Sequence, residues 1–226
     1  MLNFEVDPAM LAASVPTGTE LDRWDGRTIV SMVGFHFRDT RVAGVPVPFH
    51  RHFVEVNLRF YVRRRDPQDG WRRGVVFVKE IVPRRAIAWV ARRLYNERYV
   101  ALPMRRDVLA PRDGIPGHAT YSWRLGQRWH RLGAEIAGPA MPTVDGSEEQ
   151  FVTEHFWGYV RQRDDSALEY QVEHPRWRVW HARATWFDCD VGALYGPAFA
   201  PFLAQPPRSA FVADGSAVIV RRGVPV

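Results

Sequence analysis

The chain has 226 residues, a net charge of +6 and one cysteine, Cys189. This length suits one large domain over residues 1–226, which buries enough surface to fold without disulfides or a structural metal. One cysteine excludes an intramolecular disulfide and suits a reducing compartment, so we expect a cytoplasmic protein in which Cys189 is structural. No apolar run approaches the roughly 18 residues of a membrane helix, so we expect no membrane partner.

All but one of the 31 basic residues are arginine, and Lys79 is the only lysine. The arginines are spread along the chain and interleaved with acidic residues, which favours a solvated surface over nucleic acid binding. We therefore expect no nucleic acid partner. The nine tryptophans leave a homo-oligomer open, because exposed aromatic side chains can form a subunit interface.

Residues 2–15 have helical apolar spacing, and residues 28–37 have the composition of a strand. Residues 54–62 alternate most clearly between apolar and polar side chains, and the turn at 66–70 connects them to a second strand at 74–82. The two strands therefore predict a hairpin. Pro83 then opens a predicted helix that ends near Tyr95.

The rest of the chain adds more short strands than helices. Two further hairpins are predicted, at 119–125 with 128–136 and at 156–162 with 168–174, followed by strands at 177–187 and 216–222. Ser147 begins a capping box for a short helix, and residues 194–202 predict another. This pattern predicts a mainly β protein, an antiparallel sheet closed or nearly closed into a barrel with a few flanking helices.

Read in this way, the whole chain resembles the YqjF-like family of uncharacterised bacterial proteins, which is grouped with acetoacetate decarboxylase. The segments that carry the resemblance are Val15–Asp22, Gly26–Val30, Phe53–Val62, Glu80–Pro83, Arg93–Glu97, Tyr99–Pro103, Thr153–Phe156 and His174–Pro175. The resemblance implies a cone-shaped antiparallel β-barrel with a central pocket. In the decarboxylases, that pocket holds a lysine that is activated by a second lysine and forms an imine with the oxo acid.

The paired lysines of the decarboxylases have no counterpart here. The corresponding stretch, residues 94–98, contains no amine nucleophile, and arginine cannot replace lysine because it stays protonated. Glu55 matches an acidic pocket residue of the decarboxylases by its place after Phe53. The resemblance therefore implies the barrel and its pocket, while acetoacetate decarboxylase activity is not expected.

Four polar side chains, Glu55, Asn57, Arg59 and Tyr61, share one face of the strand at 54–62. On the inward face of a barrel, Arg59 would clamp a carboxylate and Glu55 would act as an acid or base. Alternation alone leaves a solvated polar face equally open, with the valine face in the core. The resemblance at Glu55 favours the pocket.

Glu80 and Lys79 compete for the inward position on the neighbouring strand. Strict alternation places Lys79 with Val75 and Phe77. We nevertheless interpret Lys79 as an exposed lysine at a strand end, and Glu80 as the inward residue, which either caps the helix after Pro83 or lines the pocket.

Tyr95, Asn96 and Tyr99 occupy the stretch where the decarboxylases place their lysines. They could donate hydrogen bonds to a bound oxyanion, although helix capping by Asn96 with two packed tyrosines is equally open. Tyr121 on a later strand completes the predicted set.

None of the eight histidines has metal-binding spacing, and no nucleotide-binding fingerprint occurs, so we expect no metal and no cofactor. The predicted catalytic residues are Glu55, Arg59 and Glu80, and the predicted ligand contacts are Asn57, Tyr61, Tyr95, Asn96, Tyr99 and Tyr121. The predicted function is to bind or transform a small organic acid or oxo acid by acid–base chemistry without an imine, as a lyase or hydrolase. The alternative is a non-catalytic ligand-binding or interaction module on the same fold.

Overall fold

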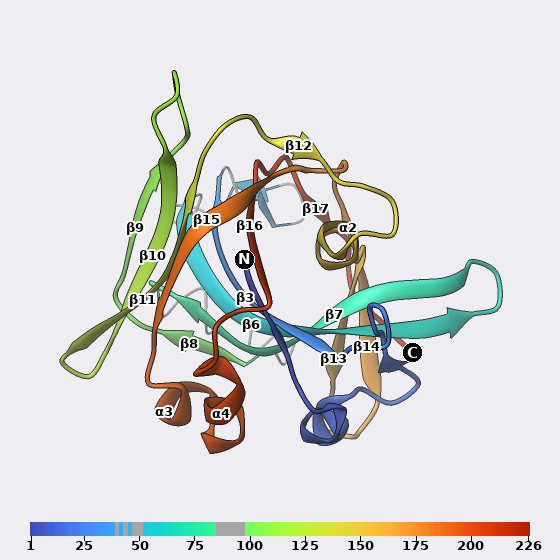
Figure 1. Cartoon of the computed structure of the whole chain (residues 1–226). Helices are drawn as coiled ribbons and strands as arrows, with labels where there is room; N and C mark the ends of the chain where they lie inside the picture. Colours follow the sequence, from blue (N-terminus) through green and yellow to red (C-terminus); the bar gives the residue numbers. More distant parts are fainter. Residues whose placement is uncertain (39–40, 43–44, 47–51, 85–97) are drawn as a thin grey trace.

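The computed structural model describes residues 1–38, 41–42, 45–46, 52–84 and 98–226 (Figure 1). Within these residues, sixteen strands form one sheet. In sheet order, its main path is β17 (Ile219–Val220), β14 (Ala167–Glu173), β13 (Trp157–Arg161), β7 (Gly70–Val82), β6 (Phe53–Asp66), β3 (Ile29–Phe37), β1 (Leu2–Glu5), β16 (Ser209–Ala213), β15 (Arg178–Asp188), β11 (Arg128–Ile136), β10 (Gly117–Leu125) and β9 (Met104–Leu109).

Short elements complete the described part of the chain. The flanking strands are β2 (Glu20–Leu21) on β6, β8 (Tyr99–Ala101) on β7, β12 (Met141–Pro142) on β15 and β18 (Val224–Pro225) on β14, while β4 (Arg41–Val42) and β5 (Val45–Pro46) pair with each other. The helices are α2 (Glu148–Thr153), α3 (Val191–Tyr195) and α4 (Ala200–Leu203), with 3₁₀ turns η1 (Pro8–Met10), η2 (Ala12–Ser14) and η3 (Pro197–Phe199). No described helix has the length and apolar character needed to cross a bilayer.

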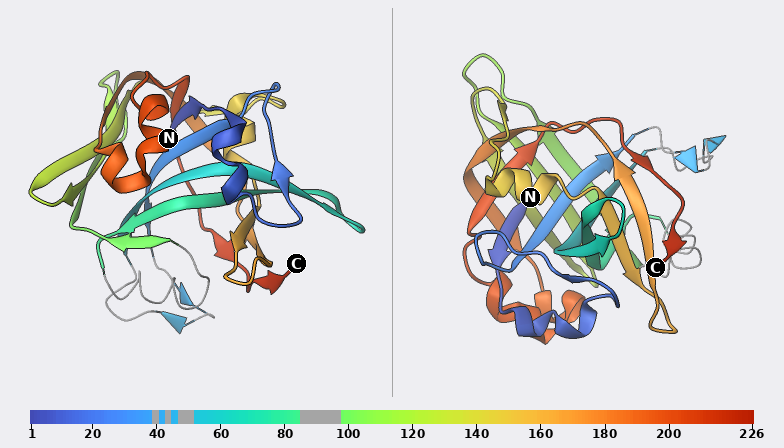
Figure 2. Two further views of the ribbon diagram at one scale, coloured as in Figure 1. Left: turned by 90° about the horizontal axis from the view of Figure 1, so that it is seen from below. Right: turned by 90° about the vertical axis from the view of Figure 1, so that its right-hand side faces the viewer.

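The mainly β prediction is confirmed, but a closed barrel is not. The long sheet curls so that β10 and β11 contact β3, and β9 contacts β6 (Figures 1 and 2). Its two edges, β17 and β9, are not joined by hydrogen bonds among the described strands. The sequence pattern fixes which residues alternate between faces, whereas closure depends on pairing between strands that are far apart in the chain.

The sheet buries apolar side chains on both of its faces. The valine face of β6 packs against residues of β1, β10 and β11 and against α3 and α4, forming the larger hydrophobic cluster. The opposite face of β6 contributes to a smaller cluster with β7, β15, β16 and α2. Because both faces of β6 are covered, its polar side chains lie inside the molecule.

The three predicted hairpins are confirmed, as is the helix after Ser147, whose hydroxyl accepts a hydrogen bond from the Gln150 backbone amide. The helix predicted over residues 2–15 is wrong, because residues 2–5 form a strand between β3 and β16. The single helix predicted over residues 194–202 is also wrong. Gly196, with a φ of 102°, and Pro197 separate α3 from the turns that follow. The helix predicted after Pro83 lies outside the described residues.

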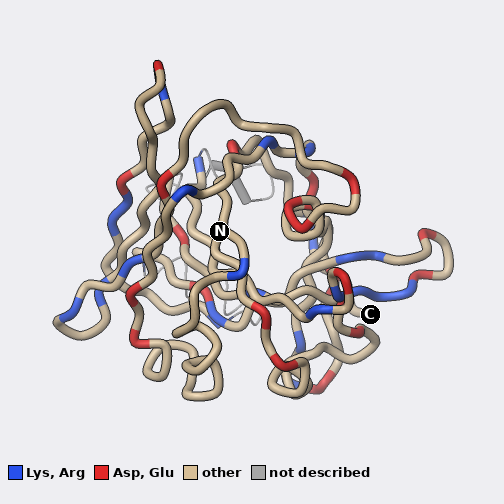
Figure 3. Tube along the Cα trace, in the orientation of Figure 1, with Lys and Arg blue, Asp and Glu red and all other residues tan. Residues whose placement is uncertain are grey.

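Charged residues are interspersed along the trace (Figure 3). Several arginines of strands β6 and β7 are ion-paired. Arg63 Nη2 lies 2.6 Å from Glu20 Oε1, and Arg72 Nη1 lies 2.6 Å from the buried Glu169 Oε1. These arginines therefore have structural partners within the chain.

Candidate functional site

The polar face of β6 is buried. Glu55, Asn57 and Tyr61 are 2 %, 1 % and 1 % exposed, and Arg59 is half-buried. These four side chains share a face because successive side chains on a strand point to opposite sides. The alternative of a solvated polar face is therefore wrong.

A β-bulge brings Glu80 to the same face. Glu80 on β7 pairs with Asn57 on β6, whereas Phe77 pairs with Arg59, so β7 has one extra residue between these pairs. Because side chains alternate with a period of two, the extra residue places Glu80 on the side of Phe77 and moves Lys79 to the other side. Strict alternation, which grouped Lys79 with Phe77, is therefore wrong on this strand. Glu80 is 2 % exposed, which agrees with the inward position predicted for it.

Lys79 faces away from this site. It pairs with Leu58, and its ammonium group donates a hydrogen bond to the backbone carbonyl of Leu194 in α3. The side chain is half-buried, so the expectation of an exposed strand-end lysine is wrong. Burial and the nearby charge of Arg98 lower the pKa of Lys79.

Glu55 and Glu80 form a buried pair of carboxyl groups. Glu55 Oε1 accepts a hydrogen bond from Asn57 Nδ2 at 3.2 Å, and Glu55 Oε2 accepts one from the Tyr99 hydroxyl at 3.3 Å. The Glu80 side chain is also hydrogen-bonded to Glu55. Ionised carboxylates are acceptors only, so this bond requires that one of the two groups is protonated.

Burial raises the pKa of Glu55 from 4.5 to about 7. The hydrogen bonds from Asn57, Glu80 and Tyr99 and the charge of Arg59 oppose this rise. A carboxyl group that titrates near neutrality can both accept and release a proton at pH 7. The pair is therefore suited to general acid–base chemistry.

Two polar atoms beside the pair have no hydrogen-bond partner among the described residues: Asn57 Oδ1 and Arg59 Nε. Arg59 is held in place by a 3.0 Å hydrogen bond from Nη2 to the carbonyl of Val152 in α2, and its guanidinium carbon lies 5.7 Å from the Tyr61 ring centre. Buried polar atoms are almost always satisfied in folded proteins. This acceptor and this donor are therefore suited to a polar ligand.

Tyr61 belongs to an internal hydrogen-bond network. Its hydroxyl lies 2.6 Å from Ser31 Oγ, which donates to Asn3 Oδ1 at 2.6 Å. Asn3 Nδ2 donates to Ser209 Oγ at 2.8 Å, and that hydroxyl donates to Glu148 Oε1 at 2.8 Å. Because Ser31 donates to Asn3, Tyr61 must donate to Ser31, and the network fixes the tyrosine ring beside the site.

Tyr121 is not part of this site. Its ring covers Gly34 on β3, where an added Cβ would lie 2.5 Å from a ring carbon. Gly34 pairs with Val56, so Tyr121 packs against the valine face of β6, opposite Glu55. The prediction that Tyr121 lines the same pocket is wrong. Tyr95 and Asn96 lie outside the described residues.

A buried ionic cluster near α2 was missed from the sequence. His155 Nε2 lies 3.0 Å from Asp22 Oδ2, which also accepts a 2.6 Å hydrogen bond from Arg73 Nε, and His155 Nδ1 lies 2.5 Å from the carbonyl of Phe151. Burial lowers the pKa of His155, and the Asp22 carboxylate opposes this. Asp22 and His155 are 133 residues apart, so no local pattern could have paired them.

Within the described residues, no three or more His, Cys, Asp or Glu side chains group as metal ligands. Burial, together with Asp190 and Asp188, raises the pKa of Cys189 to about 12, as expected for an unreactive thiol. A surface cavity of about 170 Å³ opens where Phe4 and Phe202 meet Arg208, away from the predicted site residues.

The chain matches the model of the DUF2071 family, described as "Uncharacterized conserved protein (COG2071)", over residues 1–217. The chain belongs to this family. The DUF2071 chain is 26 % identical to the uncharacterized protein YqjF of Bacillus subtilis over 183 residues, which are 80 % of this chain and 72 % of YqjF. The resemblance inferred from the sequence is thereby confirmed.

Solved structures share the fold of this DUF2071 protein at low sequence identity. Acetoacetate decarboxylase from Legionella pneumophila aligns with a TM-score of 0.60 and 12 % identity, over 100 % of this chain and 82 % of the decarboxylase. The enduracididine biosynthesis enzyme MppR, solved in complex with pyruvate, aligns with a TM-score of 0.59 and 11 % identity, over 94 % of this chain and 80 % of MppR. An acetoacetate decarboxylase-like enzyme from Sphingomonas wittichii aligns with a TM-score of 0.54 and 14 % identity, over 97 % of this chain and 84 % of that enzyme. These likenesses establish the fold.

Proposed function

We propose that this protein binds a small oxo acid beside Glu55 and Glu80 and exchanges a proton with it, without forming an imine. The observation that carries the proposal is the buried carboxyl pair, in which the pKa of Glu55 is about 7. A base that titrates near neutrality can remove a proton from a carbon next to a carbonyl group and return it. The fold likeness to MppR, which was solved with pyruvate, adds support for an oxo acid ligand.

In the proposed step, the Glu55 carboxylate takes a proton from the carbon next to the ligand's carbonyl group. The electron pair of that C–H bond moves towards the carbonyl, and an enolate forms on the carbonyl oxygen. Return of the proton to carbon or to oxygen completes the step, which consumes no other reactant. Arg59 Nε, which has no partner among the described residues, would donate to the ligand's carboxylate.

The position of Lys79 supports chemistry without an imine. Lys79 is the only lysine in the sequence, and it lies on the opposite face of the sheet with its ammonium group bonded to a backbone carbonyl. Arg59 and Tyr99 flank the carboxyl pair and are both partly exposed. A ligand would approach the pair between these two side chains.

Deuterium exchange tests the proposal. Pyruvate, 2-oxobutyrate and acetoacetate are incubated with the protein in D₂O, and loss of the proton signals next to the carbonyl is followed by NMR. The wild type is expected to accelerate exchange of at least one acid, with a rate that rises as the pH increases through about 7, because Glu55 must be ionised to act as the base. Glu55→Gln should abolish the acceleration, whereas Glu5→Gln, which alters an exposed carboxylate, should retain it.

Two results would contradict this function. Acceleration that survives in Glu55→Gln would show that another group is the base. A melting shift on ligand addition without any exchange would favour the non-catalytic binding module instead. Borohydride treatment of the protein with each oxo acid should give no adduct at Lys79 by mass spectrometry.

A further inference from the structure

A second polar cluster lies on the opposite face of the sheet from Glu55. The Tyr121 ring covers Gly34 on β3, and His36 lies two residues further along the same face. Arg106 on β9 is the cross-strand partner of Tyr121 on β10. Arg38 Nε donates a long hydrogen bond of 3.4 Å to His36 Nδ1. The end of β3, together with β9 and β10, therefore brings these polar side chains to one place.

The electrostatics agree with this convergence. Burial lowers the pKa of His36, and the charges of Arg106, Arg38 and His52 lower it further. Burial raises the pKa of Tyr121, and the same two arginines oppose that rise. The imidazole and the phenol both feel the charges of both guanidinium groups, which agrees with the placement of the four side chains by β3, β9 and β10.

All four groups carry hydrogen-bond donors. His36 Nδ1 accepts from Arg38, so the proton of the neutral ring is on Nε2. The phenol of Tyr121 remains protonated at neutral pH because its pKa is raised. Neither Arg38 nor Arg106 forms an ion pair with a carboxylate among the described residues. A set of donors with two fixed positive charges complements an oxyanion.

We propose that His36, Arg38, Arg106 and Tyr121 bind a small oxyanion, the phosphate or carboxylate group of a ligand. The site is independent of the proposed proton transfer, since Glu55 pairs with Phe35 and projects from the other face of the same two strands. Its ligand would lie between the end of β3 and the β9–β10 hairpin.

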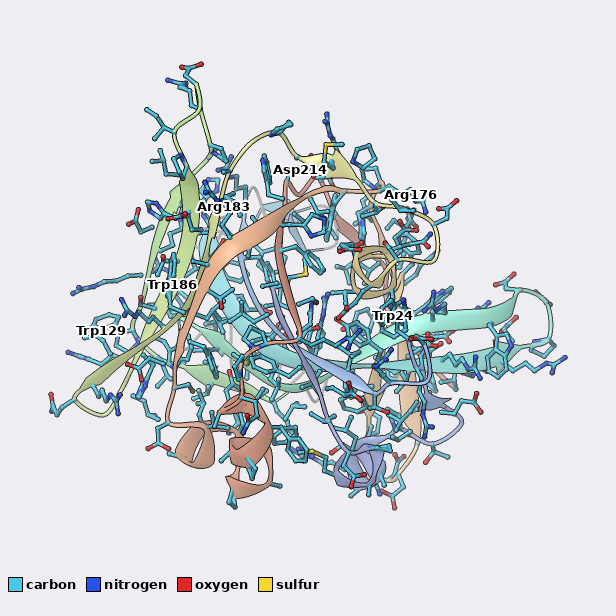
Figure 4. The ribbon with its side chains drawn as sticks, in the orientation of Figure 1. Trp24, Trp129, Arg176, Arg183, Trp186 and Asp214 are labelled. Atoms are coloured by element: carbon cyan, nitrogen blue, oxygen red, sulfur yellow. The ribbon has the colours of Figure 1, made fainter. Side chains whose placement is uncertain are left out.

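Two neighbouring arginines provide a matched test. Arg106→Gln removes a charge on the Tyr121 side of β9, whereas Arg105→Gln removes the same charge from the other side, where the Arg105 guanidinium carbon lies 4.2 Å from the ring centre of Trp129. Trp129 is labelled in Figure 4. Calorimetric titration with inorganic phosphate and, separately, with malonate measures binding. Loss of one charge-assisted hydrogen bond should weaken binding about tenfold or more in Arg106→Gln, against less than about twofold in Arg105→Gln.

The NMR signals of the His36 ring provide a second measurement. They should shift on addition of the bound anion, and Tyr121→Phe should weaken the same response. Binding of phosphate alone or of malonate alone supports the site and identifies which oxyanion it takes. The proposal is overturned if neither anion binds at concentrations up to about 10 mM, if both arginine variants weaken binding equally, or if the His36 signals do not move.

Discussion

Replacing Glu55 with glutamine should change how the stability of the protein depends on pH. Glutamine is close to glutamate in shape and keeps one acceptor oxygen, which can take the hydrogen bond from Asn57 or the one from Tyr99, but it does not titrate. The comparison of Glu55→Gln with the wild type therefore isolates the proton of the buried carboxyl pair.

The magnitude follows from the pKa of Glu55, which burial raises from 4.5 to about 7. A group whose pKa is raised on folding contributes stability that is fully present below pH 4.5 and is lost as the pH rises through 7. A rise from 4.5 to about 7 corresponds to about 3 kcal/mol. The free energy of unfolding of Glu55→Gln minus that of the wild type should therefore be about 3 kcal/mol larger at pH 8 than at pH 4.

Urea unfolding measured by tryptophan fluorescence provides the assay, since the chain has nine tryptophans. The free energy of unfolding is determined for both proteins at intervals from pH 4 to pH 8.5, and titrating groups outside the carboxyl pair cancel in the difference between the two proteins. Glu5→Gln serves as the control for the loss of one exposed carboxylate outside the pair. A difference for Glu55→Gln that does not change with pH would refute a raised pKa, as would one that changes in the opposite direction.

Two substitutions test the packing around the site. Gly34→Ala would place a Cβ 2.5 Å from the Tyr121 ring, so we expect it to destabilise the fold by about 1–3 kcal/mol. The loss is measured as a lower midpoint of urea unfolding. An unchanged midpoint would show that the Tyr121 ring does not pack on β3. Ser31→Ala would leave the hydroxyl of Tyr61 and the Oδ1 of Asn3 without their partner, at a cost of about 1–3 kcal/mol for each buried group. A loss below about 0.5 kcal/mol in Ser31→Ala would contradict the buried network.

The hairpins were predictable because their signals are local. Asp66 to Gly70, Gly126 with Gln127 and the Asp164–Asp165 pair each interrupt an alternating pattern with residues that favour turns. The N-terminal strand was missed because an apolar residue every second or third position suits a helix as well as a strand. Only its pairing with β3 and β16 decides between them.

The site was partly predictable, and its errors have a physical cause. Glu55 and Asn57 follow simple alternation, so their common face could be inferred. The bulge on β7 has no local signature, and it reverses the faces of Lys79 and Glu80. Tyr121 was misplaced because alternation shows that a strand has two faces without showing which face meets a distant strand.

Carbon-13 NMR of the glutamate side-chain carboxyl carbons follows the proton on Glu55 directly. With Glu55→Gln identifying the signal, the Glu55 carbon is expected to titrate near pH 7, with a coupled response from Glu80 because the two carboxyl groups are hydrogen-bonded. A Glu55 signal that is fully ionised by pH 5 would contradict the raised pKa of Glu55, and ionisation of both Glu55 and Glu80 by pH 5 would contradict a carboxyl pair that carries a proton at neutrality.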